Sequence, residues 1–199
     1  IRPDVSVITN INFAHIKNFK SIKHIALAKS EIIQNTNPGG YVILNADDNF
    51  FSFHKKIVTQ NNLKLVSFGI RNSQSDMKFL DIKKKENHFQ LWTQINGVKK
   101  HFLVSNNFQT NIYNILATIA VMSIYKNVFQ LDKDIFFKFK VPQGRGDISK
   151  IKILKKNINL VDESYNSNPL SLKSAVLNYD KIRTKKNKKY LLLGDMLEL

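Results

Sequence analysis

Two side chains near the start of the chain, His15 and Lys29, have the types and the spacing to do chemistry together. His15 lies in a polar loop after a short apolar run, and Lys29 lies on a helix that we predict over residues 21–35. Apolar residues recur along this helix with helical spacing, and Lys29 falls in the middle of them: Ile22, Ile25, Ala26, Ile32 and Ile33. A lysine in such a stripe must extend its amine to solvent, find a partner or lose its charge.

The residues alone leave two interpretations of this pair open. In the first, the stem of Lys29 covers apolar surface and His15 is an ordinary hydrogen-bonded histidine. In the second, both side chains lie where a buried strand passes into the next helix, and they help to hold a metal ion, with the lysine in a modified form.

The elements around the pair alternate between strand and helix. Apolar runs predict buried strands over residues 5–8, 41–44 and 63–68, separated by helices over 21–35 and 49–59. This order is typical of an α/β domain with a doubly wound, mostly parallel sheet. Three later segments, with Asn96-Gly97 as a hairpin signal, alternate apolar and polar residues and predict a small antiparallel layer at an edge of the sheet: 77–83, 89–95 and 99–104.

A long helix is predicted over residues 111–125, and Asn111 and Asn114 share a face at its N-terminus. Free N–H groups there favour a phosphate or other polar ligand, although capping plus a surface amide explains the same residues. A short helix is predicted over 134–139. The proline and glycines that follow indicate a linker, so we expect one domain over 1–143 and a second over 144–199.

The second domain is predicted to begin with paired strands over residues 148–154 and 157–161, closed by Asp162 and Glu163. These two acids are either a solvated strand end or part of a ligand site. Asn168 and Pro169 have the types of an N-cap and a first helical residue, and the helix should run to about residue 183. Its inward side chains should be Leu172, Ala175, Val176, Tyr179 and Ile182. A strand over 189–193 should follow, with Gly194-Asp195 at its carboxyl end, where open α/β sheets bind ligands.

The composition limits the class of protein. A net charge of +16 favours anionic partners, but the lysines are scattered along the chain, so we expect no nucleic-acid partner. The chain has no cysteine, which suits a reducing cytoplasm. No apolar run approaches the roughly 20 residues that span a bilayer, and the first residues do not have the pattern of a signal peptide. We expect a cytoplasmic monomer that does not insert into membranes.

Several stretches, in this order along the chain, resemble the Mur ligases: residues 10–15, 28–32, 44–48, 144–146, 162–169 and 193–199. The resemblance implies the central ATP-binding domain of that family, followed by the start of a Rossmann-like C-terminal domain. It also implies an ATP-dependent amide ligase of peptidoglycan precursor synthesis. The stretches 162–169 and 193–199 favour the member that joins D-alanyl-D-alanine to UDP-N-acetylmuramoyl-tripeptide through an acyl phosphate.

Other interpretations remain open beside this one. Within the superfamily, the alternatives are another Mur ligase or a ligase similar to folylpolyglutamate synthetase. From different classes, the alternatives are a basic nucleic-acid-binding module and an α/β interaction domain. The chain has no helix-turn-helix, RNP or zinc pattern, which disfavours the nucleic-acid module.

The resemblance implies ATP and Mg²⁺ as cofactors. His15 and a carbamylated Lys29 would ligate Mg²⁺, which prefers oxygen anions, and Arg145 would neutralise phosphate charge. The residues that would bind the nucleotide are Asn111, Asn114, Arg145, Asp162, Glu163, Tyr165 and Asn166. The chain departs from the family pattern in three places: Phe108 replaces a glycine, Thr110 replaces a histidine, and Glu163 replaces an aspartate.

The chain contains no Gly-Lys-Ser/Thr phosphate loop. The family places this loop upstream of the first strand, together with an acidic metal ligand and the domain that binds uridine diphosphate. We therefore expect the chain to be an internal part of a longer enzyme, and we expect the 199 residues by themselves to lack ligase activity.

Overall fold

The chain divides into two compact units, which are described separately. The computed structural model describes residues 2–12, 19–105, 111–139, 142–182 and 188–196. The first unit comprises Ile1–Ile11 and Lys23–Lys140, and the second comprises Asn12–Ile22 and Val141–Leu199.

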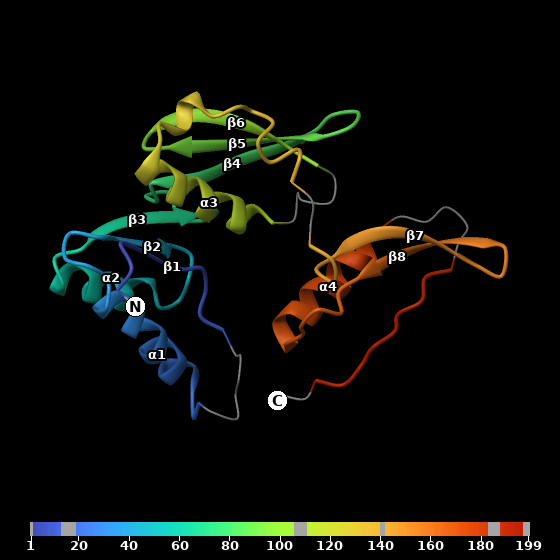
Figure 1. The fold of residues 1–199 in the computed structure, drawn as a ribbon, viewed down its shortest axis with the longest axis horizontal. Helices are drawn as coiled ribbons and strands as arrows, with labels where there is room; N and C mark the ends of the chain where they lie inside the picture. Colours follow the sequence, from blue (N-terminus) through green and yellow to red (C-terminus); the bar gives the residue numbers. More distant parts are fainter. Residues whose placement is uncertain (1, 13–18, 106–110, 140–141, 183–187, 197–199) are drawn as a thin grey trace. The chain divides into compact units, whose positions relative to one another are not determined.

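The first unit is built on one six-stranded sheet with the order β1-β2-β3-β4-β5-β6 (Figure 1). Neighbours are parallel from β1 to β4 and antiparallel from β4 to β6. The predicted mostly parallel α/β sheet is confirmed, and the antiparallel strands continue its β3 edge. The strands are β1 (Val5–Ile8), β2 (Tyr41–Asn45), β3 (Lys64–Gly69), β4 (Met77–Lys84), β5 (Phe89–Ile95) and β6 (Val98–Val104).

Helices lie on both faces of this sheet: α1 (Ile22–Gln34), α2 (Phe51–Gln60) and α3 (Ile112–Tyr125). Helix α3 packs on β2, β3 and β4, whereas α2 packs on β2 and β3 from the other face (Figure 1). Because side chains alternate along a strand, Ile43 enters the core beneath α3 while Val42 and Leu44 point to the opposite face. The core beneath α3 includes Phe68, Met77, Phe102, Ile115, Leu116 and Ile119.

Helix α1 departs from the predicted stripe at Ile32. Ile25 and Ile33 are buried as expected, but Ile32 is 41% exposed. Lys29 is exposed as well, although it lies four residues after Ile25 and four before Ile33. Lys29 therefore reaches solvent from within the apolar stripe.

The prediction of a short helix over residues 134–139 is wrong. A 3₁₀ helix, η2 (Val128–Gln130), lies just before this segment, and Asn127 caps it by accepting from the Phe129 N–H. The predicted segment itself forms turns, in which the Phe137 N–H donates to the Asp134 carbonyl at 2.8 Å. An apolar pattern over so few residues does not distinguish turns from a helix.

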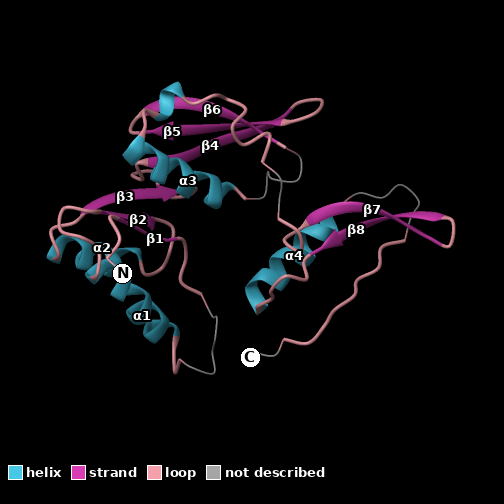
Figure 2. Cartoon of the chain, in the orientation of Figure 1, coloured by secondary structure: helices cyan, strands magenta, loops and turns pink. Residues whose placement is uncertain are grey.

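The second unit contains the antiparallel hairpin of β7 (Asp147–Ile153) and β8 (Lys156–Asp162), followed by α4 (Pro169–Lys181) (Figure 2). The predicted hairpin and helix start are confirmed. The Asn168 side chain accepts from the Ser171 N–H, and the Ser171 hydroxyl accepts from the Asn168 N–H, both at 2.9 Å.

The strand predicted over residues 189–193 is wrong, because residues 188–196 form no strand. A strand needs the backbone of a neighbour to complete its hydrogen bonds. The carbonyl of Tyr190 instead accepts from the hydroxyl of Tyr179 at 2.9 Å. Two residues predicted to face inward from α4 and its end, Val176 and Ile182, are exposed.

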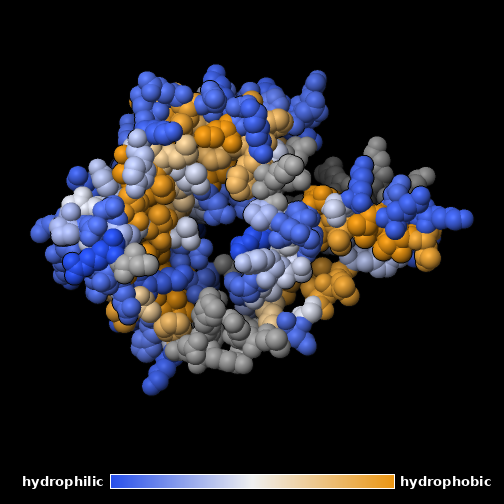
Figure 3. Space-filling view, viewed as in Figure 1, coloured by the Kyte–Doolittle hydropathy of each residue, from blue (hydrophilic) through white to orange (hydrophobic). Residues whose placement is uncertain are grey.

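Apolar side chains also remain exposed over the β7–β8 hairpin (Figure 3). Within the described part of the chain, no helix combines the length and the apolar character needed to cross a bilayer.

Candidate functional site

The Lys29 side chain reaches the carboxyl end of strand β1. Its Nζ donates to the carbonyl of Asn10 at 3.1 Å, two residues beyond the last residue of β1. Carboxyl ends of parallel strands are where open α/β sheets bind ligands. His15 lies outside the described residues, so its pairing with Lys29 stays a prediction.

A magnesium site here depends on the chemical form of Lys29. An ammonium has no lone pair for a metal, whereas a carbamate presents anionic oxygens. Within the described ranges, no group of three or more His, Cys, Asp or Glu residues could hold a metal ion. The magnesium ligands predicted here, His15 and a carbamate on Lys29, stay a prediction.

The last residue of β2 and the segment after it hold the ends of neighbouring strands together. The Asn45 amide donates to the Thr9 carbonyl at 3.0 Å, and the Asp48 carboxylate accepts from the Ile11 N–H at 2.7 Å. Both contacts fix the backbone that follows β1, on either side of Asn10. They therefore help to position the Asn10 carbonyl, which accepts a hydrogen bond from Lys29 Nζ.

Asp47, in the same segment, accepts four hydrogen bonds from other parts of the first unit. The donors are the N–H groups of Ile70, Arg71 and Asn72, at 2.6, 2.9 and 2.7 Å, and the Tyr113 hydroxyl at 3.0 Å. Burial opposes the charge of Asp47, but these donors outweigh it and lower its pKa. Burial and the bond to Asp47 raise the pKa of Tyr113.

This network of Asp47 was not predicted from the sequence. The signal that could have indicated it is the pair of consecutive acids soon after a buried strand. Carboxylates at this position can accept from backbone N–H groups that follow the neighbouring strand.

The amides of Asn111 and Asn114 meet at the start of α3. Asn111 occupies the N-cap position, but its side chain makes no capping hydrogen bond. Its Oδ1 instead accepts from Nδ2 of Asn114 at 3.2 Å. The capping interpretation of the Asn111 side chain is therefore wrong. Phe108 and Thr110 lie outside the described residues.

In the second unit, the β7–β8 hairpin brings together two motifs that are distant in sequence. The Gly146 N–H donates to the Asp162 carbonyl at 2.6 Å, and the Tyr165 N–H donates to the Gly144 carbonyl at 3.0 Å. Gly144 and Gly146 have φ values of +75° and +89°, a conformation that favours glycine. Residues 144–146 therefore lie directly against residues 162–165.

Arg145 lies over the ring of Tyr165, with 4.2 Å between the guanidinium carbon and the ring centre. Both side chains are exposed, Tyr165 to 67%. A cation–π contact of this kind attracts the guanidinium to the ring and uses none of its N–H donors for a hydrogen bond. Asn166 follows Tyr165 in the chain and is exposed.

The two acids at the end of this hairpin have opposite pKa shifts. Hydrogen bonds from Ser164, including its N–H at 2.9 Å, lower the pKa of Asp162. Partial burial of its carboxyl, together with the charges of Asp147 and Asp162, raises the pKa of Glu163. The neighbouring acids thus differ in their readiness to take up a proton.

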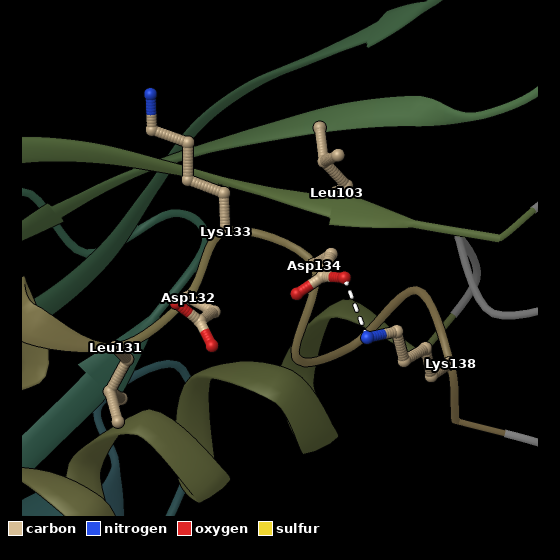
Figure 4. A pocket seen from close by; sticks show the side chains of 6 residues that line it. All are labelled: Leu103, Leu131, Asp132, Lys133, Asp134 and Lys138. Atoms are coloured by element: carbon tan, nitrogen blue, oxygen red, sulfur yellow. Dashed lines mark ion pairs between the residues drawn. The ribbon is translucent and has the colours of Figure 1, made fainter.

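A separate hollow of about 590 Å³ lies beside β6 in the first unit (Figure 4). Asp134 and Lys138 form an ion pair across part of it, at 3.0 Å. The hollow is open and charged, and none of the sequence-predicted site residues lines it. Its lining residues are Leu103, Leu131, Asp132, Lys133, Asp134 and Lys138.

Comparison with known proteins identifies the class of protein. Residues 1–122 match the model of the Mur ligase middle domain. Since this match covers more than half of the chain, the chain belongs to the Mur ligase family.

Individual relatives extend the similarity along the whole chain. A UDP-N-acetylmuramoyl-tripeptide–D-alanyl-D-alanine ligase of Buchnera aphidicola is 32% identical over 200 residues, which cover 100% of this chain and 42% of the relative. The ligase of the same name from Escherichia coli K12 is 26% identical over 198 residues, with the same coverage. The chain therefore spans about two fifths of the length of these relatives.

Solved structures share the fold. MurF from Acinetobacter baumannii superposes with a TM-score of 0.75 at 21% identity, covering 92% of this chain and 38% of that protein. MurF from Thermotoga maritima in complex with ADP gives a TM-score of 0.72 at 21% identity, covering 88% of this chain and 39% of that protein.

Proposed function

We propose that this chain is part of an ATP-dependent amide ligase that adds D-alanyl-D-alanine to UDP-N-acetylmuramoyl-tripeptide. The observation that carries the proposal is the similarity of the whole chain, at 32% identity, to the Buchnera aphidicola ligase of that name. Membership of the family supports a peptidoglycan precursor ligase in general. The choice of D-alanyl-D-alanine is supported by relatives of that name that match 100% of this chain, whereas an L-alanine ligase of Hydrogenobaculum matches 91% of it.

The proposed reaction has two chemical steps. The terminal carboxylate of the tripeptide attacks the γ-phosphorus of ATP, and ADP leaves. The amine of D-alanyl-D-alanine then attacks the acyl carbon of the resulting acyl phosphate, and collapse of the tetrahedral intermediate releases phosphate. Negative charge gathers on the phosphoryl oxygens, so positioning and charge neutralisation lower the barrier.

Arg145 has the role of neutralising phosphate charge in this proposal. Its position over the Tyr165 ring, at 4.2 Å, supports that role, because a cation–π contact uses none of the N–H donors that a phosphate would accept from. In the first unit, Asn111 and Asn114 would contact the nucleoside. In the second unit, the residues proposed to contact the nucleotide are Asp162, Glu163, Tyr165 and Asn166.

Lys29 would act as a metal ligand in carbamate form. Its neutral amine adds to carbon dioxide and releases a proton, which leaves an anionic carbamate at the carboxyl end of β1. His15 and this carbamate would hold Mg²⁺, which supplies positive charge beside the phosphates when bound. The contact of Lys29 with the Asn10 carbonyl supports its location at this edge of the sheet.

The test uses a protein of the relatives' full length that contains this chain. We expect ATP-dependent joining of D-alanyl-D-alanine to UDP-N-acetylmuramoyl-tripeptide, with one ADP and one phosphate released per amide formed. Lys29→Ala should lower kcat by about a hundredfold or more, the usual scale for losing a charge-stabilising group. Lys23→Ala is the matched control, because Lys23 is an exposed lysine on the same helix.

Two results would contradict the proposal at different points. Full activity in Lys29→Ala, or no carbamate mass shift on Lys29 in the active enzyme, would refute the role of Lys29. No ATP-dependent ligation by the wild type, or a preference for a different amine, would refute the reaction itself.

A further inference from the structure

Asp47 has no part in the proposed chemistry, yet its carboxylate is fully engaged. Three of its hydrogen bonds come from residues 70–72, after β3, and the fourth comes from the Tyr113 hydroxyl on α3. Three of these bonds go to Oδ2 and one goes to Oδ1, so most of the acceptor capacity of the carboxylate is used within the first unit. Any contribution of Asp47 must therefore pass through the groups that it holds.

One of those groups, Tyr113, belongs to the first turn of α3. It stands between Asn111 and Asn114, whose amides bond to each other at 3.2 Å. The Asn111 side chain does not cap this turn. A first turn without a side-chain cap opens easily. The Tyr113–Asp47 bond thus anchors this turn to the end of β2.

The anchor itself is held firmly. The Arg71 guanidinium donates to the backbone carbonyl of Asp47 at 3.0 Å, while the Arg71 N–H donates to the carboxylate. The segment after β3 therefore grips both the main chain and the side chain of Asp47. The lowered pKa of Asp47 keeps the carboxylate charged at neutral pH.

We propose that Asp47 is a positioning residue for the nucleotide, which holds Asn111 and Asn114 through Tyr113 at the carboxyl edge of the sheet. This inference rests on the proposed function, in which the two asparagines contact the nucleoside of ATP. It predicts that loss of the anchor weakens ATP binding more than it slows the chemical steps.

Three single variants separate this role from a general effect on stability. Tyr113→Phe removes the hydroxyl that donates to Asp47 and that also contacts the Arg71 side chain, and it leaves the other bonds of Asp47 in place. Asp47→Asn leaves an amide that has fewer lone pairs and directs its own N–H groups at the donors. Asp76→Asn is the matched control. Asp76 is half-buried, lies in the same β3–β4 connection as residues 70–72, and accepts from the N–H and hydroxyl of Ser67 at 2.7 and 2.6 Å.

These variants are made in a protein that contains this chain and is as long as its full-length relatives. We expect the KM for ATP to rise about three- to tenfold in Tyr113→Phe, and further in Asp47→Asn. The value of kcat and the KM for D-alanyl-D-alanine should change by less than about twofold in Tyr113→Phe. Asp76→Asn should lower the Tm and leave the KM for ATP unchanged. The KM for ATP of the double variant, with Asp47→Asn and Tyr113→Phe, should equal that of Asp47→Asn alone, because each change breaks the same Tyr113–Asp47 bond.

An unchanged KM for ATP in Tyr113→Phe, or an equal rise in Asp76→Asn, would overturn the inference. If the wild type performs no ATP-dependent ligation, the proposed function has failed instead. Hydrogen exchange then tests the anchor directly, at the Ile115 N–H that donates to the Asn111 carbonyl. Faster exchange in Tyr113→Phe than in the wild type supports the anchor, and unchanged exchange overturns it.

Discussion

The substitution Gly144→Ala tests the contact between the Gly-Arg-Gly segment and the end of β8. Gly144 has a φ of +75°, which costs an L-residue about 1–2 kcal/mol. A Cβ added there would lie 3.0 Å from both the Cβ and the backbone nitrogen of Tyr165. These atoms cannot swing aside as a long side chain would, because the Tyr165 N–H is bonded to the Gly144 carbonyl. The substitution must therefore push the two segments apart.

Gly97→Ala is a matched control for the magnitude. Gly97 has a φ of +86°, and an added Cβ would have no atom within 4 Å. Both substitutions carry the left-handed cost, offset by about 0.4–1 kcal/mol from a stiffer unfolded chain, so Gly97→Ala should cost about 1 kcal/mol. Crowding in a packed site adds about 1–3 kcal/mol, which raises the expected cost of Gly144→Ala to about 2–4 kcal/mol.

Two probes follow the two units separately. Trp92, the only tryptophan of the chain, lies on β5 and reports unfolding of the first unit by fluorescence. Hydrogen exchange of the β7–β8 amides reports opening of the second unit. We expect Gly144→Ala to speed this exchange about 30-fold or more and to leave the Trp92 transition unchanged. If Gly144→Ala costs no more than Gly97→Ala, the close approach of Gly144 to Tyr165 is absent and the reasoning fails.

Two pH-dependent effects are also expected. The pKa of Asp47 is lower in the folded state, so its contribution to stability is present above about pH 4 and is lost as the pH falls through the folded value. The stability gap between wild type and Asp47→Asn, measured by Trp92 fluorescence in urea, should therefore narrow below about pH 4; a constant gap would contradict this. The pKa of Glu163 is higher in the folded state, because of burial and the charges of Asp147 and Asp162, so the charged form opposes folding at neutral pH. At pH 7, the β7–β8 amides should exchange more slowly in Glu163→Gln than in the wild type. Near pH 4, the two proteins should exchange at similar rates. Faster exchange in Glu163→Gln at pH 7 would contradict the destabilising effect of the Glu163 charge.

Local patterns were enough to predict most elements and the family. The period of apolar residues indicated the strands and helices of the first unit, and an N-cap followed by proline indicated the start of α4 at Asn168. These signals are contained in a few neighbouring residues, so they can be detected without knowing what packs where. The same locality explains the two failures, at 134–139 and 189–193, since turns and strands depend on which backbone groups lie nearby.

Tertiary structure alone decided which polar groups meet. Two consecutive acids after β2 can indicate a polar strand end, but they do not indicate that Asp47 accepts from residues 70–72 and from Tyr113, 66 positions away. Likewise, the contact of Gly144 with Tyr165 exists because β7 and β8 pair in one register. Lys29 reaches the Asn10 carbonyl because α1 passes the end of β1. Hydrogen bonds of this kind are selected by the packing of distant segments, which the spacing of residues along the chain does not record.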